Sequence, residues 1–144
     1  MHVRGQIRAR LFETLRTVEG LVGGVVHDFP EVVQETDLPI AYLWIGPEDV
    51  QPITLGGLQE REAQVFVDVI GLDNSEQIER LDEILARIET RVAADQTLGG
   101  LVQACTLRAV AVDREDGGGQ ATLRYRVQFD TQYRTLTGAP DAPA

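Results

Sequence analysis

The residue types that most often carry out chemistry are scarce in this chain. It holds two histidines, His2 and His27, and one cysteine, Cys105. His27 could form a small metal site with Asp28 and Glu31, but no further ligand stands nearby, so an ordinary surface histidine is the simpler interpretation. Cys105 has no histidine beside it and falls in a strand-like pattern, which favours a small buried residue over a nucleophile. We therefore expect no catalytic, cofactor-binding or metal-binding residues.

Charged side chains inside strand-like segments are the remaining candidates. Asp68 stands in the middle of an apolar strand pattern. If buried, it needs a partner such as an arginine across the sheet or at a subunit contact; otherwise it lies at an edge or faces solvent. Arg108, Arg124 and Arg126 could line a solvated sheet face, or an interface that pairs with carboxylates of another subunit, a contact that arginine suits. Both interpretations stay open.

The overall charge is acidic. The chain has 144 residues, a net charge of −10 and 13 basic residues, all arginine. Such a chain has no overall field for binding DNA, because affinity for phosphate needs a basic footprint. The acidity favours solubility, or a surface that DNA passes without sticking. We find neither a signal-peptide pattern at the N-terminus nor an apolar run of membrane-spanning length, and expect no membrane contact.

Hydrophobic periodicity predicts the elements that must position these residues. The length fits one domain over residues 1–135, followed by a disordered tail at 136–144. The pattern predicts helices at 5–19 and 75–93, strands at 40–45, 60–70, 104–113 and 121–130, a brief edge strand within 25–35, and a long loop or hairpin arm at 46–59.

Each helix has one apolar stripe, and the strands cluster around the two helices. Residues 75–93 begin after the capping candidates Asn74 and Ser75. Residues 60–70 alternate, with Ala63 and every second residue to Val69 on one face. In residues 104–113 the alternation places Cys105 and Leu107 opposite Val110 and Val112. The prediction is an α+β fold, with an antiparallel or mixed sheet and two helices packed on one face.

The order of these segments and their residue patterns resemble those of a known protein family. The matching parts are "IRARLFETLRTVEGLVGGVV", "DLPIAYLWIGPEDVQP", "REAQVFVDVIGLDNSEQIERLDEILARIETRVAAD", "TLGGLVQACTLRAVAVD" and "ATLRYRVQFDTQYRT". Together they resemble the tail terminator (tail completion) proteins of long-tailed phages and related phage-like particles, over the chain to about residue 135.

This resemblance implies a structural virion protein without enzymatic activity or cofactor. Such proteins form a six-membered ring on the finished tail tube, at the tail–neck junction, after assembly in the host cytoplasm. The ring stops tube growth and presents a surface to the head-side connector, and DNA crosses it without specific binding. The partners implied are further copies of the chain, the tail tube protein and the connector.

In a tail terminator ring, the 46–59 arm would be the segment best placed to reach a neighbouring subunit or the tube. The candidate interface residues are Asp49, Val50, Gln51, Ile53, Leu55, Arg108, Arg124 and Arg126.

Two alternatives stay open. One is another phage neck or head–tail joining protein. The other is a small α+β ligand-binding module or enzyme, which predicts a convergent polar cluster in a pocket between helices and sheet.

Overall fold

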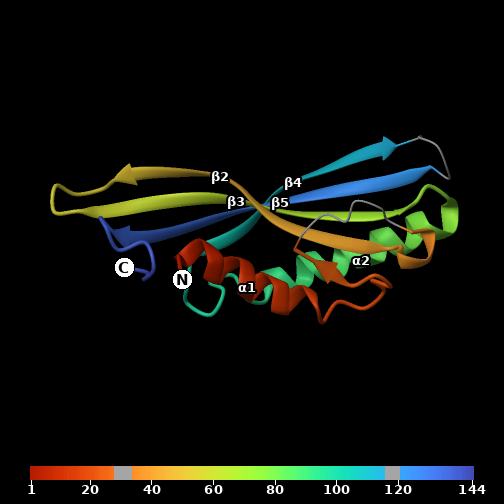
Figure 1. The fold of residues 1–144 in the computed structure, drawn as a ribbon, viewed down its shortest axis with the longest axis horizontal. Helices are drawn as coiled ribbons and strands as arrows, with labels where there is room; N and C mark the ends of the chain where they lie inside the picture. The colour runs from red at the N-terminus through yellow and green to blue at the C-terminus, as the bar shows by residue number, and fades with distance from the viewer. Residues whose placement is uncertain (28–33, 116–120) are drawn as a thin grey trace.

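The computed structural model describes residues 1–27, 34–115 and 121–144. Its elements follow the order helix, strands, helix, strands (Figure 1). They are α1 (Val3–Leu15), β1 (Val25–Val26), the 3-10 turn η1 (Glu35–Asp37), β2 (Ile40–Pro52), β3 (Leu58–Leu72), α2 (Ser75–Ala93), β4 (Ala104–Glu115) and β5 (Thr122–Leu136).

The five strands form one twisted sheet in the order β1-β2-β3-β5-β4. β1 pairs with β2 in parallel, and the other neighbours pair antiparallel. Both helices lie on the same face of this mixed sheet (Figure 1). The predicted α+β fold is therefore confirmed.

α2 spans the residues that the sequence predicts. The side chain of Asn74 accepts a hydrogen bond of 2.9 Å from the backbone N–H of Gln77, which satisfies a donor that the first turn leaves free. Glu76 in the first turn and Arg91 in the last have the charges that the helix dipole favours. One stripe of the helix is buried against the sheet: Leu81, Ile84, Leu85, Ile88 and Val92.

α1 closes the same core but ends four residues earlier than predicted. Beyond Leu15 the chain tightens, because the N–H of Thr17 bonds to Thr14 and that of Val18 bonds to Leu15, each three residues back. Val18 still buries its side chain. The fully buried core residues of α1, β2 and β3 are Val3, Ile7, Leu11, Leu15, Ala41, Leu43, Ala63, Val65, Val67 and Val69.

The prediction that Gly46 and Pro47 end the second strand is wrong. β2 continues to Pro52 because the two residues form a bulge, which keeps the proline, with no N–H, out of the ladder. A Cβ on Gly46 would lie 2.5 Å from the Phe66 ring, so glycine fits this close approach. The 46–59 segment is accordingly the hairpin arm, one of the two forms expected for it.

A second bulge changes the faces of β4. The predicted alternation holds at Cys105 and Leu107, but the register then shifts by one residue at Arg108. Val110 and Val112 therefore lie on the helix side of the sheet, as Cys105 does. The prediction that they lie on the face opposite Cys105 is wrong. The helices leave this stretch of β4 uncovered, and Leu107, Val110 and Val112 stay 41–56% exposed.

The end of the chain, for which we expect disorder from residue 136 onward, lies against α1 and β5. Leu136 is the last residue of β5, and the backbone N–H of Val3 donates to Pro140 at 2.8 Å. The N–H of Ala144 donates to Arg134 at 2.7 Å. The two termini consequently lie close together (Figure 1).

We expect Ile88→Ala to lower the free energy of unfolding by about 2–5 kcal/mol, because Ile88 is fully buried and truncation leaves a cavity. Glu83→Ala, on the solvent side of the same helix, is the matched control and should cost less than about 0.5 kcal/mol. Urea denaturation of both variants checks this. Equal losses would mean that α2 does not pack on the sheet as described.

Candidate functional site

The predicted 46–59 arm corresponds in the structure to the hairpin of residues 48–62, which is called the arm from here on. It extends past both helices to one end of the molecule (Figure 1). The end of β5 pairs along it as a third strand, up to the pair Leu58 and Leu136. The sequence-predicted arm residues are all exposed: Asp49, Val50, Gln51, Ile53 and Leu55. Leu55 at the turn is fully exposed. Apolar residues gathered on a projecting element are typical of a contact surface.

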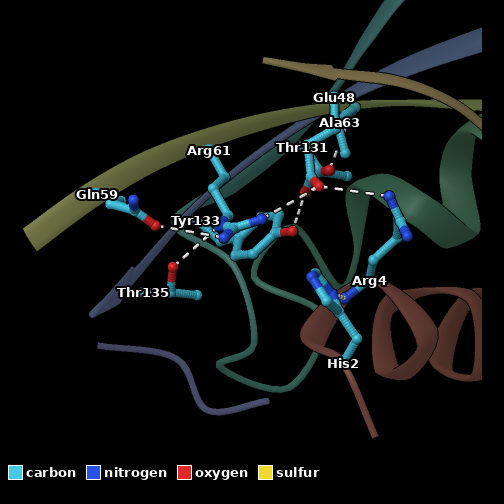
Figure 2. A network of polar contacts seen from close by, with 9 residues as sticks. All are labelled: His2, Arg4, Glu48, Gln59, Arg61, Ala63, Thr131, Tyr133 and Thr135. Carbon is cyan, nitrogen blue, oxygen red and sulfur yellow. Dashed lines mark hydrogen bonds and ion pairs between the residues drawn. The ribbon is translucent and has the colours of Figure 1, made fainter. Parts of the chain in front are cut away.

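The buried carboxylate of Glu48 holds the base of the arm in place. The Glu48 side chain is 7% exposed and lies where the arm leaves the core (Figure 2). Its carboxylate accepts hydrogen bonds from the Tyr133 hydroxyl and from guanidinium groups of Arg61 at 3.4 Å and Arg4 at 3.5 Å. A buried carboxylate needs such hydrogen-bond donors, because removing an unpaired charge from water costs a large amount of free energy. Glu48 thus joins β2 to β3, β5 and α1.

Arg61 extends this network across the sheet. Its Nε donates to the Thr135 hydroxyl at 2.9 Å, and one Nη donates to the side-chain oxygen of Gln59 at 3.3 Å (Figure 2). The phenol of Tyr133 is fully buried, and burial, aided by its bond to the Glu48 carboxylate, raises its pKa above the usual value. These contacts set the direction in which the arm leaves the core.

The sequence reasoning missed this network. A signal was available in β5, where the inward alternation from Leu123 to Phe129 continues through Thr131 to Tyr133. The predicted strand ended at residue 130, which left Tyr133 outside it. The partnership between Tyr133 and Glu48 joins residues 85 positions apart, so no local pattern indicates it.

A second polar cluster lies on the face of the sheet away from the helices. Asp68 is 2% exposed, and Arg126 on the adjacent strand donates to it twice, from Nε at 2.9 Å and from Nη2 at 3.1 Å. The indole N–H of Trp44 donates to the same carboxylate at 3.3 Å. Trp44 stacks on Phe66, and the guanidinium of Arg126 lies 5.1 Å from the Trp44 ring. The hydrogen bond to Asp68 raises the pKa of Arg126.

The cluster answers the question raised by Asp68, because its partner is an arginine across the sheet in the same chain. The other two predicted arginines also lie near carboxylates of their own chain. Arg124 lies 3.4 Å from Glu115, and Arg108 lies 3.8 Å from Asp130. A role of these arginines at a subunit interface stays a prediction.

The metal site considered in the sequence analysis, His27 with Asp28 and Glu31, lies mostly outside the described residues. Only His27 is among them. His27 stacks on Phe12 with ring centroids 4.0 Å apart. Within the described ranges, no group of three or more histidine, cysteine, aspartate or glutamate side chains could hold a metal ion. Cys105 is buried in the core, and burial raises the pKa of its thiol to about 12.

No family model matches this chain, and no curated protein matches it. Across the part of the chain that the structure describes, no helix combines the length and the apolar character needed to cross a membrane.

The Glu48 network predicts different costs for its two arginines. We expect Arg61→Ala to lower the free energy of unfolding by about 3 kcal/mol, because the Arg61 side chain is 14% exposed and its loss leaves a buried carboxylate short of a donor. Arg4→Ala is the matched control. It should cost less than about 1 kcal/mol, because the Arg4 side chain is 48% exposed and solvent screens its ion pair. Similar costs in urea denaturation would contradict this account.

The raised pKa values of Cys105 and Tyr133 predict loss of stability in alkali. The folded state favours the neutral thiol and phenol, so their contribution is complete below their ordinary pKa values of about 8.5 and 10 and falls as the pH rises toward the folded-state values. Unfolding should therefore need less urea at pH 10.5 than at pH 8, and Cys105→Ala should reduce that difference. Rapid reaction of folded protein with a thiol reagent at pH 8 would contradict the burial of Cys105.

Proposed function

We propose that this chain is a structural virion protein that forms a ring on the head-proximal end of a phage tail tube. The ring ends tube polymerisation and provides the joint to the head connector. Its partners are further copies of the chain, six in the ring that the resemblance implies, together with the tail tube protein and a connector protein. It acts at the tail–neck junction without enzymatic chemistry.

The projection of the arm beyond the helices is the observation that best supports this proposal. Subunits of a ring must contact different surfaces on their neighbours, and a projecting element with apolar residues at its tip meets that need. Three exposed apolar residues, Val50, Ile53 and Leu55, lie on the arm. Its base is fixed by the Glu48 network, so little conformational freedom is lost when the tip binds.

The charge of the chain supports the same proposal. A ring through which DNA passes should repel the phosphate backbone, and a net charge of −10 provides that repulsion. The resemblance in segment order to tail terminator proteins supplies the particular function.

The experiment that tests the proposal measures growth of tail tubes. Tube protein from the same particle is polymerised with and without this chain, and tube lengths are measured by negative-stain electron microscopy. We expect the chain to shorten the tubes and to appear as a cap at one end. The double variant Ile53→Glu, Leu55→Glu should lose at least about tenfold in potency, because burying a charge at an apolar contact is costly.

Val22→Glu is the matched control, since Val22 is an exposed apolar residue outside the arm. It should cap tubes like the wild-type chain. Tubes that grow to the same lengths in excess wild-type chain, with uncapped ends, would overturn the proposal.

A further inference from the structure

We propose that the arm of one copy docks into a cationic groove along α1 of the next copy. This inference deepens the proposed function, on which it rests for the closed ring, by naming the surface that receives the arm. The arm contributes apolar residues and carboxylates, and the groove contributes apolar walls and arginines.

The arm has carboxylates that its own chain does not neutralise. Asp49 on β2 lies directly opposite Glu62 on β3, and both are exposed. Like charges facing each other across two strands repel, so this pair destabilises an isolated hairpin. Among the described residues neither carboxylate forms an ion pair. A cation from outside the arm would relieve the repulsion.

The groove lies at the base of the arm, along the exposed side of α1. One hollow of about 410 Å³ is lined by His2, Arg4, Arg8 and Met1, with Ile45 of β2 as an apolar wall. A second hollow, of about 380 Å³, shares Met1 and Arg8 with the first. The two hollows therefore form one groove, which follows α1.

The second hollow reaches the far wall of the groove, where Phe12 stacks on His27. Both histidines of the chain line the groove, His2 in the first hollow and His27 in the second.

The cations of the groove are available to a partner. Arg8 is exposed and forms no ion pair among the described residues. Arg4 is half exposed, and its contact with Glu48, at 3.5 Å, leaves the rest of its guanidinium free to donate. Glu13, the carboxylate that lines the second hollow, already pairs with Arg16 at 3.0 Å. The groove thus complements the acidic, apolar-tipped arm in both charge and hydrophobicity.

The arm that fills the groove must come from a second copy. Each arm starts at the groove of its own chain, because Ile45 and Gly46 line that groove, and it extends away to the end of the molecule (Figure 1). Pairing with β5 along the arm prevents the tip from folding back. Tip and groove are different surfaces, so repeated docking is head-to-tail and produces a ring or an open chain of copies.

Two variants separate the two halves of this contact. Leu55→Glu disables the arm and leaves the groove intact, with Val22→Glu as its matched control. Arg8→Glu disables the groove and leaves the arm intact. Its matched control is Arg80→Glu, at an exposed arginine of α2. Circular dichroism verifies that each variant is folded.

Light scattering over a concentration series measures self-association of the purified chains. We expect the mass of the wild-type chain and both controls to rise above that of a monomer. The dissociation constant of each test variant should rise at least about tenfold, because like charges then meet or a charge enters an apolar contact. An equimolar mixture of the two test variants should form a dimer and grow no further, since only one working arm and one working groove remain per pair.

Several results would overturn the inference. They are a wild-type chain that stays monomeric at every concentration, an Arg8→Glu chain that associates like the wild type, and a mixture that forms no dimer. Loss of association in Val112→Glu but not in Arg8→Glu would place the receiving surface on the exposed edge of β4 instead. Failure of the proposed function is a separate result, because wild-type chain would then leave tube growth unchanged. Arg8→Glu chain that caps tubes normally would overturn the docking alone.

Discussion

A carboxylate that leaves water must find donors in the protein, and the placement of the arm depends on how Glu48 meets this demand. Its donors come from three different elements: Arg61 on β3, Tyr133 on β5 and Arg4 on α1. Satisfying one buried charge therefore fixes the relative positions of those elements at the point where the helices no longer cover the sheet. Without these contacts, only the backbone pairing and the bonds of Arg61 to Thr135 and Gln59 would set the direction of the exposed strands beyond Glu48.

The sheet extends beyond its helices because its central strands are long. β3 and β5 each have 15 residues, and the apolar residues of β3 that pack under α1 and α2 begin at Ala63. From Gln59 to Glu62 the strand carries polar and charged residues, which need no apolar cover. One strand thus serves two environments, a covered half that supplies the folding free energy and an exposed half that is free to contact a partner.

The sequence predicts those elements whose signals are local. The cap at Asn74 and the apolar stripe of α2 define that helix from its first residue to its last, and the alternation at 60–70 assigns both faces of β3. The bulges at Gly46 and Arg108 were missed, because a single inserted residue inverts the faces of a strand without a pattern of its own. Glycine and proline are also usual at strand ends, so Gly46 and Pro47 indicated an end where the strand continues.

The arm projects far from its base at Gly46 and Pro47, so any change of angle at this base, its pivot, displaces the tip by a larger distance. The roughly 7 residues from Glu48 to the turn, at about 3.3 Å each, place the tip about 20 Å from its pivot. A tilt of about 10° at the pivot would then move the tip by about 4 Å, the separation at which side chains gain or lose contact. Small rearrangements around the Glu48 carboxylate would thus be amplified at the far end of the molecule, where Leu55 projects.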